Sequence, residues 1–302
     1  MSLILVHGAA GAQARPVAEQ LLAAGHRVRL LVRRPEAVAD LAARGAEIAR
    51  GDLADPDSLA AAHIGVEGVF LLLPFFDPQI SHAVHAIDAA RNAGVRQIVW
   101  NTTGTIPPLR TGNPGVDIRL DILALLRAST IPFVALQPTA YMENLLGPWT
   151  AAEVAEKDQL AYPIPNSVTL QWISHQDAAA FAVAAFARLP EGEHLIEICG
   201  PETLTGEAMA ARFTTALGRP IRFRPMPPRE FGALLDRVFG GGGDAIATFY
   251  ESVHENPAIL STAIDYEALQ KILPIEATNL ETFARRHRSA FTNNQNSTGA
   301  AA

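Results

Sequence analysis

The first residues whose types suggest chemistry form a loop of small side chains near the N-terminus. Gly8, Gly11 and Ala14 are spaced three apart, between an apolar run at 3–6 and a helical pattern at 15–24. A loop that joins a strand to a helix presents free N–H groups, and small side chains let a pyrophosphate approach the backbone. We therefore predict phosphate contacts from Gly8, Ala10, Gly11, Ala12 and Gln13. The alternative is a tight turn that binds nothing.

Charged residues follow the next predicted strand, at 27–32. Arg33 and Arg34 stand where a cofactor with a free 2′-hydroxyl usually meets an acid, and the first acid here is Glu36. A guanidinium suits a 2′-phosphate, so this position favours NADP(H) over NAD(H). The competing interpretation is that both arginines are simply solvated, since arginine is the usual cation of this chain.

The other candidate positions follow later strands. Asp52 and Leu53 are expected beside the adenine, although Asp52 serves equally well as a cap of its own turn. The nicotinamide end is expected near an apolar segment and two hydroxyls, at Leu72, Leu73, Pro74, Thr102 and Thr103. A pocket for a flat hydrophobic substrate is predicted from Phe75, Phe76, Tyr141, Asn144 and Trp149, with Tyr141 as the candidate proton donor. Ordinary core packing is the alternative for these aromatic side chains.

Composition limits the class of protein. The 302 residues carry a net charge of −7 and 49% of them are hydrophobic, which indicates a packed chain and argues against nucleic acid as a partner. The single cysteine, Cys199, suits a reducing cytoplasm. We expect no signal peptide and no membrane span, because the first apolar run starts at once and none is long enough. His82 and His85 lack accompanying carboxylates, so we predict no metal site.

Strands and helices alternate along the first half of the chain. Apolar runs predict strands at 3–6, 27–32, 46–50, 69–73, 96–100 and 132–136, and helical patterns separate them at 15–24, 36–44, 55–62, 79–93 and 116–128. Short connections between alternating elements require right-handed crossovers and a parallel sheet covered on both faces. The prediction is an α/β fold with a doubly wound, Rossmann-type sheet. Ligands of such sheets bind at the carboxyl ends of the strands, where the candidate residues lie.

The alternation loosens beyond Pro148. We predict a dinucleotide-binding domain over 1–150 with return segments at about 168–200, and a smaller, interleaved α+β substrate domain over 151–291. A disordered tail is expected over 292–302, and a flexible loop at Gly240–Gly243. The patterns beyond residue 148 predict strands at 168–173, 194–198 and 221–224, and helices at 175–188, 205–217, 228–239 and about 280–290.

Several short segments together resemble the NmrA-like group of atypical short-chain dehydrogenases. They occur in the order Val6-His7-Gly8-Ala9-Ala10-Gly11, Leu31-Val32-Arg33-Arg34-Pro35, Gly51-Asp52-Leu53, Leu136-Gln137-Pro138, Tyr141-Met142-Glu143-Asn144, Trp172-Ile173-Ser174-His175-Gln176-Asp177 and Leu217-Gly218-Arg219-Pro220. The group contains a fungal nitrogen regulator, NAD(P)H:quinone oxidoreductases and triphenylmethane-dye reductases. The resemblance implies an NAD(P)-binding fold over nearly the whole chain.

One departure from short-chain dehydrogenases concerns their catalytic Tyr-x-x-x-Lys pair. No lysine precedes Lys157, and the lysine and tyrosine positions fall on Arg119 and Gly115. Arg119 cannot release a proton near neutral pH, but it can hold a ribose or stabilise an oxyanion. A solvated helix arginine is the alternative. Tyr141 and Arg119 are therefore the two candidate catalytic residues.

The resemblance and the missing pair together predict an NADPH-dependent reductase of the cytoplasm. Its hydride would pass directly to a hydrophobic conjugated acceptor such as a quinone, enone or dye, which needs no strong general acid. The alternative is a non-catalytic NADP(H) sensor that acts through a protein partner. An isomerase or epimerase relative ranks last, because such enzymes need the absent tyrosine. A homodimer is compatible with either of the first two hypotheses.

Overall fold

The computed structural model describes residues 2–74 and 79–292, and these divide into two compact units. The first unit comprises the described residues of Met1–Pro138, His175–Ile198 and Glu267–Glu276. The second comprises those of Thr139–Ser174, Cys199–Tyr266 and Ala277–Ala302. Both units are therefore built from segments that are far apart in the sequence.

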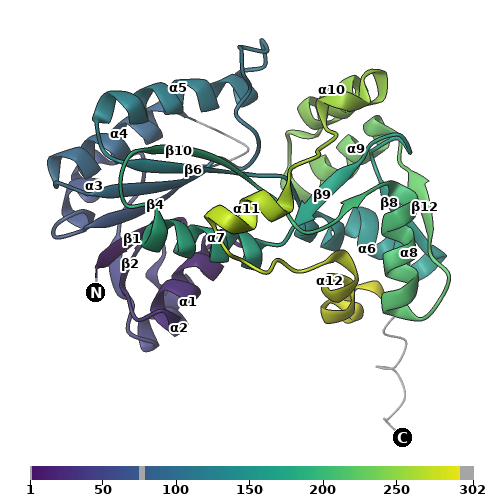
Figure 1. Ribbon diagram of the computed structural model, residues 1–302, viewed down its shortest axis with the longest axis horizontal. Coiled ribbons are helices and arrows are strands. Elements are labelled where there is room, and N and C mark those ends of the chain that lie inside the picture. The colour runs from purple at the N-terminus through teal and green to yellow at the C-terminus, as the bar shows by residue number, and fades with distance from the viewer. Residues whose placement is uncertain (1, 75–78, 293–302) are drawn as a thin grey trace, which may run out of the picture. The chain divides into compact units, whose positions relative to one another are not determined.

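A seven-stranded sheet forms the centre of the first unit, in the order β10-β6-β5-β4-β1-β2-β3 (Figure 1). Every neighbouring pair is parallel. The predicted doubly wound, Rossmann-type sheet is thereby confirmed. Its strands are β1 (Leu3–His7), β2 (Arg27–Val32), β3 (Glu47–Arg50), β4 (Gly68–Leu72), β5 (Gln97–Asn101), β6 (Phe133–Pro138) and β10 (Glu193–Ile198).

Helices cover both faces of this sheet (Figure 1). On one face α1 packs against α7, and on the other α4 packs against α3 and α5. Their bounds are α1 (Arg15–Ala23), α3 (Pro56–Ala62), α4 (Ile80–Asn92), α5 (Pro114–Ser129) and α7 (His175–Arg188); the short helices α2 (Ala39–Ala43) and α11 (Tyr266–Ile272) complete the set. The expected helix at 36–44 is instead a 3₁₀ turn at Pro35–Val38 followed by α2.

Strand β1 shows why the sheet is buried on both faces. Leu3 and Leu5 point to one face and Ile4 and Val6 to the other, and all four are at most 3% exposed. Burying an aliphatic side chain of this size contributes about 1.5–3 kcal/mol, so a continuous apolar strand is stable only between two helical layers. The carboxyl end of β1, and with it the loop that follows, is fixed by this packing.

The second unit contains two small sheets and several helices. β11 (Thr203–Leu204), β9 (Leu170–Ile173) and β7 (Ala140–Tyr141) form one sheet, and β12 (Arg222–Pro225) pairs with β8 (Gln159–Tyr162) in the other. The helices are α6 (Pro148–Lys157), α8 (Gly206–Leu217), α9 (Pro228–Phe239), α10 (Gly243–Glu255) and α12 (Leu280–Arg286). The sequence patterns missed α6 and β8. Residues 139–150 and β9, which we expected in the first domain, group with this unit because β7 pairs with β9.

The run of glycines before α10 is only partly a loop. Gly243 belongs to α10, and a Cβ added to it would lie 2.0 Å from the carbonyl oxygen of Gly232 on α9. A Cβ added to Gly232 would in turn lie 2.5 Å from the Gly243 oxygen. The two glycines let α9 and α10 approach backbone to backbone, so the expectation of a flexible loop at Gly240–Gly243 is wrong for its last residue.

Candidate dinucleotide-binding site

The loop between β1 and α1 presents small residues to solvent. Gly8, Ala10, Gly11 and Ala12 are exposed and Gln13 is half-buried, whereas Ala14 is fully buried. Gly8 has φ +73°, a conformation that glycine adopts without strain. The N–H of Gly11 donates to the Gly8 oxygen at 2.8 Å, which closes the turn. The five predicted phosphate contacts are therefore brought together on one exposed loop.

The start of α1 offers fewer donors than a helix start usually does. The Arg15 N–H already donates to the Gly11 oxygen at 3.0 Å, and Pro16 has no N–H. Anion binding at a helix start depends on unpaired N–H groups and on the helix dipole. The loop between Gly8 and Ala14 is thus the more suitable source of N–H donors for a phosphate than the first turn of α1.

A depression of about 400 Å³ lies at the carboxyl ends of β2 and β3 and is lined by Arg33, Arg50, Gly51, Asp52, Asp55 and Ser58. Arg50 was missed by sequence reasoning, although it pairs in register with Val32, directly before Arg33. Arg34 is exposed and does not line the depression. Only the β-sheet register, which brings residues 33 and 50 together, could have identified Arg50.

The two carboxylates in this depression already have local partners. Asp55 accepts hydrogen bonds from the N–H groups of Asp57 and Ser58 at the start of α3, at 3.1 and 3.3 Å. Asp52 accepts from the Ala54 N–H at 3.0 Å and lies 4.0 Å from the Nε of Arg33. Arg33 is 80% exposed in its side chain, and no ion pair of Arg50 occurs among the described residues. Arg33 pairs with Asp52 but is mostly exposed, and Arg50 is exposed, so a ligand can reach both guanidinium groups.

A second, smaller cavity of about 30 Å³ lies at the carboxyl ends of β4 and β5. It is lined by the predicted residues Leu73, Pro74, Thr102, Thr103 and Arg119, and also by Gln79, Trp100, Asn101, Gly115, Ile118 and Ile122.

Two other predicted residues lie outside this cavity. Leu72 lies next to the loop after β1, since its Cδ2 would be 3.5 Å from a Cβ on Gly8. Leu53 follows Asp52, and its carbonyl contacts the ring of His85 at 3.0 Å.

Arg119 is buried beneath the turn that follows β5. It is 9% exposed, its Nε donates to the Thr102 oxygen at 2.9 Å, and its Nη2 donates to the Thr103 oxygen at 3.4 Å. No carboxylate forms an ion pair with it in the part of the chain that the structure describes. Burial lowers the pKa of the Arg119 guanidinium from its usual value, but an arginine remains a cation at neutral pH. The alternative of a solvated helix arginine is wrong.

The remaining predicted residues belong to the second unit. Tyr141 is buried in β7 and Asn144 is exposed. Trp149 is 8% exposed, its Nε1 donates to the Asn144 oxygen at 2.8 Å, and its ring packs edge-on against Phe231. Trp149 is therefore a core residue of this unit. Phe75 and Phe76 lie outside the described residues.

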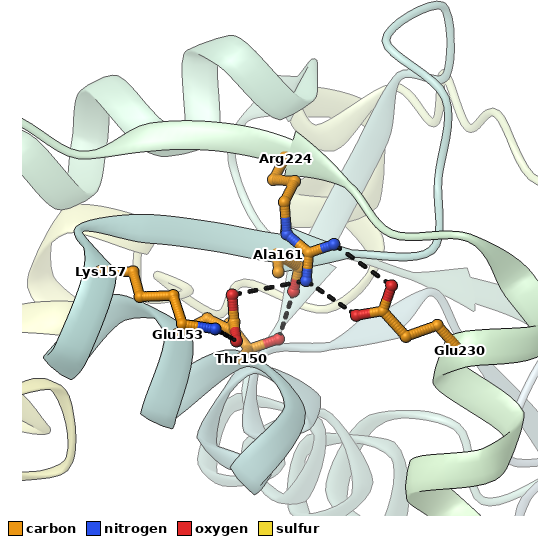
Figure 2. A network of polar contacts seen from close by, with 6 residues as sticks. All are labelled: Thr150, Glu153, Lys157, Ala161, Arg224 and Glu230. Carbon is orange, nitrogen blue, oxygen red and sulfur yellow. Dashed lines mark hydrogen bonds and ion pairs between the residues drawn. The ribbon is translucent and has the colours of Figure 1, made fainter.

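Helix α6, which carries Trp149, is tied to its neighbours by a polar network (Figure 2). Arg224 of β12 lies 3.4 Å from Glu153 of α6 and 3.0 Å from Glu230 of α9. Lys157 bonds the same Glu153 at 2.6 Å, and Thr150 donates to the Ala161 oxygen at 2.6 Å. The pKa of Arg224 is raised, chiefly by its hydrogen bond to Glu230. These contacts fix α6 against both strands of the β12–β8 sheet and against α9.

No helix among the described residues is long and apolar enough to cross a membrane. Residues 2–74 and 79–292 also contain no group of three or more His, Cys, Asp and Glu side chains that could hold a metal ion.

A parallel, doubly wound sheet with a glycine-containing loop after β1 and an arginine after β2 defines a Rossmann-type fold of the dinucleotide-binding class. Within that class, residues 1–284 match the model of the NmrA-like family, and the chain belongs to this family.

Similar proteins extend this comparison over at least 94% of the chain. The NAD(P)H azoreductase of Xenophilus azovorans is 28% identical over 294 residues, which are 96% of this chain and 99% of the relative. The structure of the NADPH-dependent quinone oxidoreductase of Escherichia coli with NADPH has a TM-score of 0.79 at 24% identity, over 95% and 99% of the chains. NmrA, a negative transcriptional regulator solved with NADP, has a TM-score of 0.73 at 18% identity, over 94% of both chains.

Proposed function

We propose that the first unit binds NADP(H), and binds it in preference to NAD(H). The observation that carries this proposal is the exposure of Gly8 and of residues 10–12 in the loop after β1, together with the exposed guanidinium groups of Arg33 and Arg50. The loop would hold the pyrophosphate through its N–H groups, and the arginines would hold the 2′-phosphate. Asp52 and Leu53 would lie at the adenine, and Arg34 would at most add long-range charge. The nicotinamide end would lie near Leu72, Leu73, Pro74, Thr102 and Thr103.

Replacing Arg33 or Arg50 with alanine tests the cofactor preference. Each variant is expected to lower NADPH affinity by about 10-fold, because a charge-assisted hydrogen bond to the 2′-phosphate is lost. NADH affinity should change little. The measurement is a fluorescence titration of NADPH, NADH and 2′,5′-ADP, and Arg34→Ala is the matched control. A wild-type preference for NADH, or a larger loss in Arg34→Ala than in the other two variants, would contradict the assignment.

We further propose that the chain reduces a hydrophobic conjugated acceptor such as a quinone, enone or azo dye. NADPH, when bound, supplies a hydride, which carries two electrons. A conjugated acceptor delocalises the resulting charge, and its proton then comes from water or from Tyr141. Such acceptors suit a chain that has Arg119 and Gly115 where short-chain dehydrogenases have their lysine and tyrosine. The full-length similarity to an NAD(P)H azoreductase supports this reaction class.

An acceptor panel tests the reaction. NADPH oxidation is followed at fixed enzyme with quinones, enones, azo dyes and simple ketones, and turnover is expected with at least one conjugated acceptor and not with ketones. Tight NADPH binding without turnover of any acceptor would contradict the proposal. That result would favour the second candidate, an NADP(H) sensor, which the fold similarity to the regulator NmrA makes worth testing. Unequal affinity for NADP⁺ and NADPH, with a partner whose binding depends on the cofactor, would then identify the sensor.

A further inference from the structure

The turn after β5 has an unusual backbone. Among the described residues, Thr103, Thr130 and Asp158 are the only non-glycine residues with positive φ. Thr130 and Asp158 cap the C-terminal ends of α5 and α6, where this conformation is common. Thr103, at φ +56°, follows a strand, and the next residue, Gly104, has φ +150°. Strained backbone of this kind persists only where its surroundings hold it, and it gathers at functional sites.

Four side chains hold this turn, and one of them is that of Thr103 itself, whose hydroxyl donates to the Thr102 oxygen at 2.7 Å. The Oδ1 of Asn101 accepts from the Thr103 N–H at 2.9 Å. The hydroxyl of Thr102 lies between two acceptors, the Gly104 oxygen within the turn and the Leu136 oxygen on β6, which is 3.0 Å away. Arg119 donates to two successive carbonyls, those of Thr102 and Thr103. A lysine has one nitrogen and cannot reproduce this arrangement, in which Nε and Nη2 of one rigid plane reach two oxygens.

The same turn is connected to the loop after β1. The Nδ2 of Asn101 lies 3.4 Å from the Oε1 of Gln13, a donor–acceptor pair between the end of β5 and the proposed phosphate loop. Both the turn and Arg119 line the cavity at the ends of β4 and β5. The two ends of the proposed cofactor site therefore share one set of contacts.

We infer that Arg119 is a positioning residue, which holds the strained Thr102–Gly104 turn in the shape that orients the nicotinamide for hydride transfer. This inference rests on the proposed function. In this role Arg119 acts through the two carbonyls that it binds, and not by binding the phosphates of the cofactor. Arg119 thus occupies the helix position of the lysine of short-chain dehydrogenases but has a different role.

The test uses Arg119→Lys and Arg119→Met in the full chain, with Arg127→Met as the matched control. Arg127 lies on the same helix, α5, but pairs with exposed Glu193. Gly104→Ala is the second variant, because a Cβ there would lie 3.1 Å from the Nη2 of Arg119 and disturb the same contact from the turn. Three readouts are compared: amide hydrogen exchange over residues 101–104, the NADPH Kd, and kcat with an acceptor that the wild type reduces.

The expected result is faster exchange over residues 101–104 and a kcat lowered by about 10-fold at a nearly unchanged NADPH Kd. Arg119→Lys should fall between wild type and Arg119→Met, and Arg127→Met should match wild type. Unchanged exchange overturns the inference. Faster exchange with unchanged kcat overturns the positioning role, because Arg119 would then only stabilise the turn.

A wild type that reduces no acceptor would sink the proposed reaction but not this inference. In that case the fluorescence emission of bound NADPH, which reports how firmly the nicotinamide is held, tests the positioning role of Arg119. Lower emission in the Arg119 and Gly104 variants at equal NADPH saturation supports the positioning role, and equal emission overturns it. A wild type that binds no NADPH overturns both proposals.

Discussion

A Gly8→Val variant is expected to lose NADPH affinity by about 100-fold while the chain stays folded. Gly8 has φ +73°, which a β-branched residue adopts only with strain. The residue is exposed, and an added Cβ makes only ordinary van der Waals contacts, 3.5 Å from Leu72 Cδ2 and 3.9 Å from Ala14 Cβ. The strain is relieved by moving the loop, and moving the loop displaces the N–H groups proposed to bind the pyrophosphate. Loss of cofactor binding would remove the proposed reductase activity with it.

Gly25→Val is the control for this variant. Gly25 has φ +82°, is exposed at the end of α1, and has no atom within 4 Å of an added Cβ. It therefore adds comparable strain at a place without a proposed ligand. We expect Gly25→Val to lower the melting temperature and leave the NADPH Kd unchanged. If both variants bind NADPH like the wild type, the loop after β1 is not the phosphate site.

The centre of the sheet in the first unit was predictable because β1 and β4 are buried on both faces. Such strands appear in the sequence as unbroken apolar runs, and β4 (Gly68–Leu72) lies within one residue of its predicted range of 69–73. The helices between them begin at local signals, for example Asp55 and Pro56 at the start of α3. The position of a strand buried between two layers is encoded in its own apolar residues. The start of a helix is encoded in its own capping residue.

The second unit was harder to predict because its elements depend on distant partners. β7 has two residues and becomes a strand only by pairing with β9, and β8 pairs with β12. The Gly232–Gly243 contact depends on α9 packing against α10. Glycine has no side chain that contributes to a hydrophobic pattern, so the sequence does not predict this contact. The sequence from 139 to 162 therefore shows no signal as strong as the apolar runs of the first unit.

The same distinction applies to the candidate site. The loop after β1 and Arg33 could be selected from consecutive residues, because a strand, small residues and a helix stand side by side in the sequence. Arg50 and Gln79 join the site only through strand register and the packing of α4. Arg119 was found through the resemblance to short-chain dehydrogenases, whose lysine position it takes, but its partners are backbone carbonyls, which no residue type reveals.

His7, the last residue of β1, makes the stability of the chain depend on pH. It is fully buried, and neither ring nitrogen has a hydrogen-bond partner among the described residues. Its ring stands edge-on to that of His63 with the centroids 5.7 Å apart. Burial, assisted by the positive charge that His63 can carry, lowers the pKa of His7 from 6.5 to about 3. Burial lowers the pKa of His63 as well.

The direction of the pH effect follows from these values. Between pH 6.5 and 3 the unfolded chain binds a proton at His7 and the folded chain does not, so acid favours unfolding. The full stability is present above pH 6.5 and is lost as the pH falls towards 3. From pH 7.5 to pH 5, we expect His7 alone to lower the free energy of unfolding by about 2 kcal/mol.

His7→Leu tests this expectation, because leucine continues the apolar pattern of β1 and cannot bind a proton. Urea unfolding at a series of pH values should give a flatter profile for the variant than for the wild type. The variant should also be more stable at neutral pH, since two unpartnered ring nitrogens leave the core. His254→Gln, which removes an exposed histidine of α10, should keep the wild-type slope. Equal slopes for wild type and His7→Leu would show that His7 gains a proton, or a partner, in the folded chain.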